Sequence, residues 1–409
     1  MEDRPRNLRA MLTEAKDTSE LMVDLGYAAL FFTDARMAEE VEELEERLSE
    51  LVHEMREVCV LAARAPREAE QMSGVLHVVA AIERMGNAAV DIARIVTHHL
   101  GIPAALLADL SAAQEVSHRV RVRDGSALAG RQLADVELPM EVGMRVVAIR
   151  RGRDWMIDPD GDDIFVPDDV LILRGSRDGI NELRELAGAP EWRPATIEED
   201  PAITDLDRAV DVLVDMKNVS EAAAGIAYSA LLFQDQGLTA EVMQLEDRLD
   251  EMREQLELWV LRAAAETVDP SPLRGLLHLG VAAEEIGDAA QQLVWLVENG
   301  EEMHPVLKVA LGEADDVVVR YPIAPGADLD GAELVGSALG DDTGFHLLAL
   351  HQRGRYVYRP RGRVTLHAGD VVLATGPREG RTKLARQCGY RLVEDDDTGE
   401  LELVPVAAT

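Results

Sequence analysis

Carboxylate side chains recur at helical spacing in two places, and metal binding is the chemistry that such a pattern could support. Glu83 and Asp91 are separated by two four-residue steps, and Glu284 and Asp288 by one, so each pair lies on one face of a helix. Carboxylate oxygens that converge from several helices suit hard divalent cations. Further acids could complete such a cluster, namely Glu45, Glu46, Glu246 and Asp247. An acidic face that is simply solvated is the interpretation that we favour over a metal site.

Arginine groups form local positive islands in an otherwise acidic chain of net charge −36. The fork of the guanidinium group matches phosphate and carboxylate groups. These residues therefore predict a binding site for a small anionic effector. The alternative is a set of salt bridges to the acidic helices. The candidate effector-binding residues are Arg150, Arg151, Arg153, His351, Arg353, Arg355, Arg359 and Arg361.

No pattern in the sequence predicts catalysis. The chain has no Gly-x-Ser-x-Gly, no His-Glu-x-x-His and no phosphate-binding loop, so we name no catalytic residue and expect no enzymatic activity. The two cysteines, Cys59 and Cys388, stand at unrelated places in the two halves. Neither a disulfide framework nor a thiolate metal site is expected from them.

The charge balance limits the classes of partner. The 77 acidic residues against 41 basic ones repel nucleic acid and anionic membranes, so neither is expected as a partner. The lysines are few, as in proteins adapted to a high-salt cytoplasm; an ordinary acidic bacterial protein is the alternative. No run approaches the ~20 apolar residues of a membrane span. We expect a cytoplasmic protein without membrane insertion. The lysines are Lys16, Lys217, Lys308 and Lys383.

The elements that must position these groups are encoded twice, because the chain repeats itself at a spacing of 201 residues. A repeat unit of this length predicts a tandem duplication of a two-domain module rather than a solenoid. Matched pairs include Lys16 and Lys217, Ser19 and Ser220, Glu20 and Glu221, Tyr27 and Tyr228, and Gly86 and Gly287.

Each module begins with a helical pattern. Alternating steps of four and three residues separate the apolar positions of one long acidic helix, which is typical of helix bundles. In the first module these positions are Met37, Val41, Leu44, Leu48, Leu51, Met55 and Val58; in the second they are Leu238, Val242, Leu245, Leu249, Met252, Leu256 and Trp259. With a helix before and a helix after, the pattern predicts an up-and-down three-helix bundle.

Each module ends with short strands and turns, which predict a small α+β domain. We expect Ser176 to cap its last helix. The fold class is therefore helical bundle plus α+β domain, present twice. The predicted boundaries are 1–104 (bundle), 110–188 (α+β domain), 189–205 (linker), 206–305 (bundle), 312–393 (α+β domain) and 394–409 (a loosely packed acidic tail).

The helical part resembles PhoU-type domains, the three-helix fold of phosphate-transport regulators. The resemblance rests on the long acidic helix and on the segments Ile82 to Asn87 and Ala283 to Asp288, which are similar to the family's Glu-Arg-x-Gly-Asp pattern. It covers about one hundred residues in each copy. It implies a regulatory role, and binding of a divalent metal ion through acidic pairs such as Glu83 and Asp91, although Asn87 replaces the family's aspartate.

The α+β part is similar to the TrkA-C domain, the C-terminal domain of potassium-transport regulators with RCK domains. The shared features are a Gly-x-x-Leu opening, a Pro-containing turn and a Gly-Asp-Val entry to the last strand. The second copy matches better, with Gly331 to Leu334, Pro360 and Gly369 to Val371. The glycine-rich nucleotide loop of full regulators is missing, which argues against NAD or ATP binding at such a loop.

Together the resemblances imply a cytoplasmic regulatory subunit of potassium or other monovalent cation transport, similar to archaeal, haloarchaeal-type accessory proteins. The implied partner is the membrane subunit of a potassium channel or transporter, which would hold the protein peripherally at the membrane. A homodimer is implied as well. The implied effector is a cyclic dinucleotide or another small anion, bound near Arg150 and His351. The alternative is a metal-binding PhoU-type regulator of phosphate transport or signalling.

Overall fold

The computed structural model describes residues 7–103, 106–107, 110, 115–152, 154–177, 179–193, 204–334, 343–352, 355–358, 364–394 and 401–406. The chain forms two compact units, each assembled from both halves of the sequence. The helical unit comprises Met1–His118 and Arg193–Ala314. The α+β unit comprises Arg119–Trp192 and Asp315–Thr409. The expected fold class, bundles plus small α+β domains in tandem, is confirmed.

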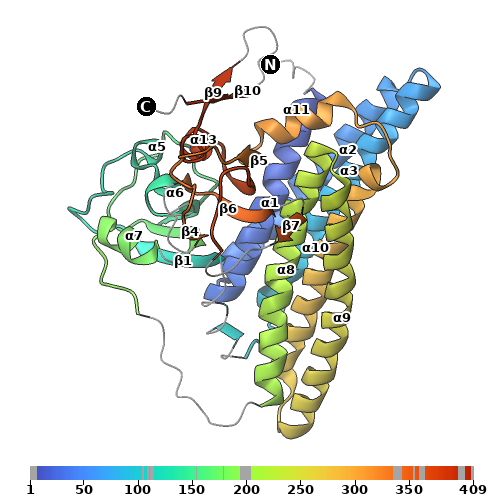
Figure 1. The fold of residues 1–409 in the computed structure, drawn as a ribbon. Coiled ribbons are helices and arrows are strands. Elements are labelled where there is room, and N and C mark those ends of the chain that lie inside the picture. Colours follow the sequence, from blue (N-terminus) through green and yellow to red (C-terminus); the bar gives the residue numbers. More distant parts are fainter. Residues whose placement is uncertain are drawn as a thin grey trace, which may run out of the picture. The chain divides into compact units, whose positions relative to one another are not determined.

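The helical unit contains two three-helix bundles, whose long helices are drawn in Figure 1. Bundle one consists of α1 (Leu8–Phe32), α2 (Ala35–Ala62) and α3 (Pro66–Thr97), and bundle two of α8 (Asp205–Phe233), α9 (Gln236–Glu266) and α10 (Arg274–Glu298). The short 3₁₀ helix η1 (Ser271–Leu273) precedes α10. The side chains of Asp34 and Asp235 accept hydrogen bonds from the first backbone N–H groups of α2 and α9. Both bundles therefore turn at the same place.

The spacing of apolar residues in α2 and α9 correctly predicted which side chains are buried. All of these positions are buried except Val58 and Trp259, which are half-buried near the ends of the helices. On the third helix of each bundle, a glycine packs against one of these buried leucines. A Cβ atom added at Gly86 would lie 2.5 Å from Leu48 Cδ2, and one at Gly287 would lie 2.4 Å from Leu249 Cδ1. Only glycine allows this close packing.

Helix α11 (Pro305–Glu313) follows bundle two but packs on the first helix of bundle one. Leu307 and Leu311 are buried on its inner face. The hydroxyl of Thr13 donates a hydrogen bond of 3.1 Å to the carbonyl of Ala310, and Arg9 pairs with Glu313 at 3.2 Å. The second module thus supplies a helix that covers part of the first.

The α+β unit contains two lobes that repeat one topology. Lobe one has the strand order β1-β4-β2-β3 and lobe two the order β5-β8-β6-β7. The strands of lobe one are β1 (Glu115–Arg121), β2 (Met144–Arg151), β3 (Asp154–Ile157) and β4 (Val170–Ser176); those of lobe two are β5 (Asp316–Pro322), β6 (His346–Gln352), β7 (Arg355–Tyr358) and β8 (Val371–Pro377). The short helices are α5 (Leu133–Val136), α6 (Leu138–Glu141), α7 (Ile180–Leu186), η3 (Arg378–Gly380) and α13 (Arg381–Gln387).

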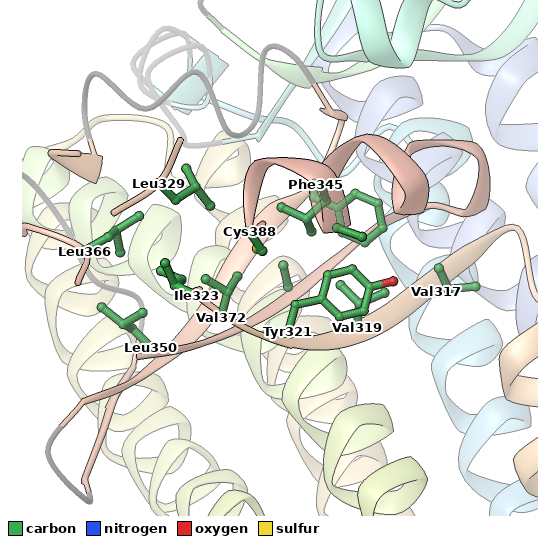
Figure 2. Close-up of a cluster of buried hydrophobic side chains, with 13 residues drawn as sticks. Val317, Val319, Tyr321, Ile323, Leu329, Phe345, Leu350, Leu366, Val372 and Cys388 are labelled. Atoms are coloured by element: carbon green, nitrogen blue, oxygen red, sulfur yellow. The ribbon is translucent and has the colours of Figure 1, made fainter. Parts of the chain in front are cut away.

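The core of lobe two lies between its sheet and helix α13. Figure 2 shows Val319, Tyr321 and Val372 on the strands, close to Phe345 and Cys388. Strand β6 pairs antiparallel with β7 and with β8, and its register shifts between Leu347 and Ala349. Strand β2 has the same irregularity, between Val146 and Ala148, so even this bulge was kept after duplication.

Two expectations were wrong, one about the start of a helix and one about the C-terminal tail. The last helix of lobe one begins only at Ile180 with Gly179 in the cap position, and Ser176 is instead the last residue of strand β4. The tail after Glu394 does not pack loosely where it is described. Strand β10 (Leu401–Pro405) pairs with β9 (Tyr390–Glu394), and Leu403 packs against the lobe-two core. The pairing with β9 and the contact of Leu403 hold this acidic segment on lobe two.

Candidate functional site

Three of the residues predicted to bind an effector, Arg150, Arg151 and His351, lie near the ends of strands β2 and β6. Arg150 and His351 occupy equivalent positions on these strands and are both half-buried. The guanidinium carbon of Arg150 lies 5.7 Å from the ring centroid of Trp155, its partner on the neighbouring strand. Within the described residues, no ion pair joins the Arg150 guanidinium to a carboxylate.

Arg151 has a different environment. Its Nε and Nη2 atoms each donate a hydrogen bond of 2.9 Å to the carboxylate of Asp169, whose side chain is fully buried. The same arginine donates to the carbonyl of Ile164. Hydrogen bonding to Asp169 is the main cause that raises the pKa of Arg151. Arg151 thus neutralises a buried charge in the turn before β4, which sequence reasoning did not foresee.

In lobe two, an uncharged side chain binds the equivalent buried aspartate. Gln352, the counterpart of Arg151, donates a hydrogen bond of 2.6 Å to Asp370, the counterpart of Asp169. In both lobes the buried carboxylate also accepts a hydrogen bond from the backbone three residues earlier, from Val166 in one and His367 in the other. The buried aspartate and its long polar partner therefore belong to the turn of both lobes.

The other predicted effector residues are only partly covered by the structure. Arg355 begins strand β7, where its backbone is paired with Gln352. The rest, Arg153, Arg353, Arg359 and Arg361, lie outside the described residues.

Each of the four predicted metal ligands is paired with an arginine. Glu83 pairs with Arg56 at 2.5 Å, Asp91 with Arg94 at 3.1 Å and Glu284 with Arg253 at 3.4 Å, while Asp288 pairs with Arg84. Within the described ranges, no three histidine, cysteine, aspartate or glutamate side chains are arranged to hold a metal ion. Metal binding at these residues stays a prediction.

Bundle two nevertheless concentrates negative charge between α9 and α10. Burial, followed by the charges of Asp250, Asp288 and Asp247, raises the pKa of Glu246 to about 6. Burial also raises the pKa of Glu284, against the opposing effect of Arg253. The folded state therefore disfavours the charged forms of these two acids, which is an electrostatic stress on the fold.

This stress predicts a pH dependence of stability. Because the folded protein holds the Glu246 proton up to about pH 6 and the unfolded chain only up to about 4.5, unfolding becomes easier as the pH rises through this window. The expected loss is roughly 1–2 kcal/mol. Urea denaturation between pH 4.5 and 7 measures it, and Glu246→Gln should flatten this component of the profile.

The matched control is Glu45→Gln, because Glu45 is the counterpart of Glu246 in bundle one, where Asn87 replaces the aspartate. An unchanged pH profile in Glu246→Gln, or the same flattening in Glu45→Gln, would contradict this assignment.

Two buried lysines form a feature that sequence reasoning recorded only as a repeat. Lys16 and Lys217 are almost fully buried, and each pairs with the glutamate four residues later, Glu20 or Glu221, at 2.6 and 2.8 Å. Such burial of lysine requires a partner. Two of the few lysines in the chain recur at the repeat spacing, and this was the signal that pointed to them.

Each lysine also contacts a tyrosine of the other bundle. Lys16 Nζ lies 5.2 Å from the ring centroid of Tyr228, and Lys217 Nζ lies 5.0 Å from that of Tyr27. Burial, and then the nearby glutamates, raise the pKa of both tyrosines, while the hydroxyls of Ser19 and Ser220 act in the opposite direction. These reciprocal cation–π contacts join the two bundles.

Family models match the chain at four places. The TrkA-C domain matches residues 118–188 and 318–389, and the PhoU domain matches residues 12–96 and 213–295. The chain is a tandem PhoU and TrkA-C domain protein. The PhoU matches fall within the two bundles of this protein, and the TrkA-C matches cover its two lobes. The resemblance drawn from the sequence is thereby confirmed for both domains and for their duplication.

Solved structures are similar to the tandem protein at low scores. PhoU from Pseudomonas aeruginosa gives a TM-score of 0.37 at 16% identity, over 72% of this chain and 96% of that chain. The GsuK channel bound to NAD gives 0.18 at 12% identity, over 78% of this chain and 65% of that chain. The GsuK RCK domain gives 0.18 at 14% identity, over 75% and 78%. Curated proteins gave no match.

None of the helices that the structure describes is both long and apolar enough to cross a lipid bilayer.

Proposed function

We propose that this protein is a regulatory subunit of potassium or other monovalent cation transport. The observation that carries the proposal is the joint occurrence, twice in one chain, of a TrkA-C domain and a PhoU domain. On this proposal the protein acts in the cytoplasm, without catalysis, on the membrane subunit of a potassium channel or transporter. The lobes sense a small anionic effector, and the bundles pass the signal to the transporter.

Uptake measurements in cells that lack the gene test the transport class. Rubidium serves as the tracer for potassium, and labelled phosphate is measured in the same cultures. We expect altered rubidium uptake with normal phosphate uptake, restored by the full-length gene. Altered phosphate uptake with normal rubidium uptake would contradict the proposal and favour a role in phosphate signalling.

Arg150 and His351 are the residues on which we base effector binding. Both are half-buried at equivalent strand ends, and the described residues leave the N–H groups of Arg150 free of carboxylates. A panel of nucleotides that includes cyclic dinucleotides should raise the unfolding temperature of the protein. The double variant Arg150→Ala with His351→Ala should lose most of this rise, because the guanidinium is the main anion ligand.

Arg391→Ala is the matched control, since Arg391 is an exposed arginine on β9. It should keep the full temperature rise. If no member of the panel stabilises the wild-type protein, effector sensing of this kind is wrong.

A metal-binding regulator of phosphate signalling is the second candidate function. It is favoured by the acids between α9 and α10, where burial and then the neighbouring carboxylates raise the pKa of Glu246. Elemental analysis of the purified protein tests it, together with unfolding temperatures in Mg²⁺, Zn²⁺ and Fe²⁺. Bound metal that disappears in Glu284→Gln with Asp288→Asn would support this candidate. Metal-free protein that no cation stabilises would count against it.

A further inference from the structure

The two bundles pack through α3 and α10, and their contacts come in reciprocal pairs. A Cβ atom added at Gly74 would lie 2.9 Å from Leu296 Cδ2, and one at Gly275 would lie 3.1 Å from Ile95 Cγ2. Gly275 and Leu296 stand 201 residues after Gly74 and Ile95. His77 stacks on Trp295 with ring centroids 4.3 Å apart. Because the start of α3 meets the end of α10 and the end of α3 meets its start, the two helices run in opposite directions.

Reciprocal contacts of this kind define an internal two-fold axis. The contacts of Lys16 with Tyr228 and of Lys217 with Tyr27 obey the same symmetry. In a symmetric dimer a residue that touches its own counterpart lies at the axis. Here the two partners are parts of one chain, and they are free to differ.

Arg84 is the residue that meets its own counterpart. Its Nε atom lies 2.6 Å from Oε2 of Glu285, which stands 201 residues later, and its Nη2 atom pairs with Asp288. Asp288 is the counterpart of Asn87. The three charged side chains are between 23% and 37% exposed, so water screens them only in part.

The charges at the axis distinguish the three ways in which bundles could pair. Two copies of bundle one would bring Arg84 against a second Arg84, with Asn87 nearby. Two copies of bundle two would bring Glu285 and Asp288 against the same two acids. Only bundle one against bundle two places opposite charges at the axis. Like charges in contact repel each other and disfavour the wrong partner.

We infer that Arg84, Glu285 and Asp288 determine which bundles pair. They favour the pairing of bundle one with bundle two and disfavour the pairing of two like bundles. This inference is independent of the proposed transport role.

Two complementary variants of the full-length chain test the inference. The acidic variant carries Arg84→Glu and Asn87→Asp, so both of its bundles are acidic at the axis. The basic variant carries Glu285→Arg and Asp288→Asn, so neither of its bundles has an acid there. Each alone should unfold at a lower temperature than wild type. Differently tagged acidic and basic chains, mixed and refolded, should co-purify about tenfold more than tagged wild-type chains do.

A variant with all four substitutions keeps the test decisive if the acidic or basic chain folds poorly. It exchanges the charges between the two bundles, and it should recover the wild-type unfolding temperature. Arg56→Glu is the control, because Arg56 pairs with Glu83 inside bundle one. It should lower the unfolding temperature without increasing co-purification with the basic variant.

Three results would overturn the inference. One is an acidic variant that is as stable as wild type. Another is a four-fold variant that is no more stable than the acidic one. The last is a mixture of acidic and basic chains that co-purifies no more than wild type.

Discussion

Gly179→Ala is expected to unfold lobe one. Gly179 stands just before helix α7 with an ordinary helical backbone, so its conformation needs no glycine. The constraint is space, because an added Cβ atom would lie 1.7 Å from the carbonyl oxygen of Val142. Relief requires moving the backbone of α7 or of the turn before β2. We expect a cost of about 3 kcal/mol or more, measured by urea denaturation.

The second module repeats this contact and supplies a replicate. A Cβ atom at Gly380, the counterpart of Gly179, would lie 2.1 Å from the carbonyl oxygen of Thr343, so Gly380→Ala should destabilise lobe two. Gly312→Ala is the control, because Gly312 lies in helix α11 with no atom near the added methyl group. It should leave stability unchanged or raise it by up to ~1 kcal/mol. Equal effects at Gly179 and Gly312 would refute the steric explanation.

Arg151→Ala is expected to cost about 2–4 kcal/mol, which is the second large effect. The substitution leaves the buried carboxylate of Asp169 with the backbone N–H of Val166 but without its cation. An uncompensated buried charge is strongly destabilising. Arg151→Gln should cost much less, because Gln352 fills this role opposite Asp370 in lobe two.

The comparison of these two variants separates hydrogen bonding from charge. If glutamine rescues stability, the hydrogen bonds to Asp169 are what the turn needs. The exposed Arg391→Ala serves again as the control and should be neutral. An Arg151→Ala protein as stable as wild type would show that Asp169 can be satisfied in another way.

Much of the fold could be predicted from the sequence because two signals agreed. The alternating spacing from Met37 to Met55 marked the buried side of α2, and the repeat placed the same seam in α9. The predictions failed where local preference competed with tertiary contacts. Serine is a residue type that often caps helices, yet Ser176 belongs to strand β4 and the helix begins after Gly179. Leu403 belongs to an acidic tail, yet it packs against the core.

The candidate sites were less predictable, because charge type does not reveal which partner a side chain will meet. Arg150 and Arg151 are neighbours in sequence, but one lies over Trp155 and the other binds Asp169. Asn87 looked like a lost metal ligand when bundle one was considered alone. It stands three residues after Arg84, on the helix whose partner α10 supplies Glu285 and Asp288. Only the packing of α3 against α10 supplies this context.

The meeting of Arg84 with Glu285 has a consequence for the history of the gene. In a single-module ancestor that paired with a second copy of itself, every substitution at this position would have appeared on both sides of the contact. Within one chain the two sides can carry different residues, as Arg84 and Glu285 do. If these charges set the pairing as inferred above, neither half of the gene alone would encode a product that pairs with itself through this face.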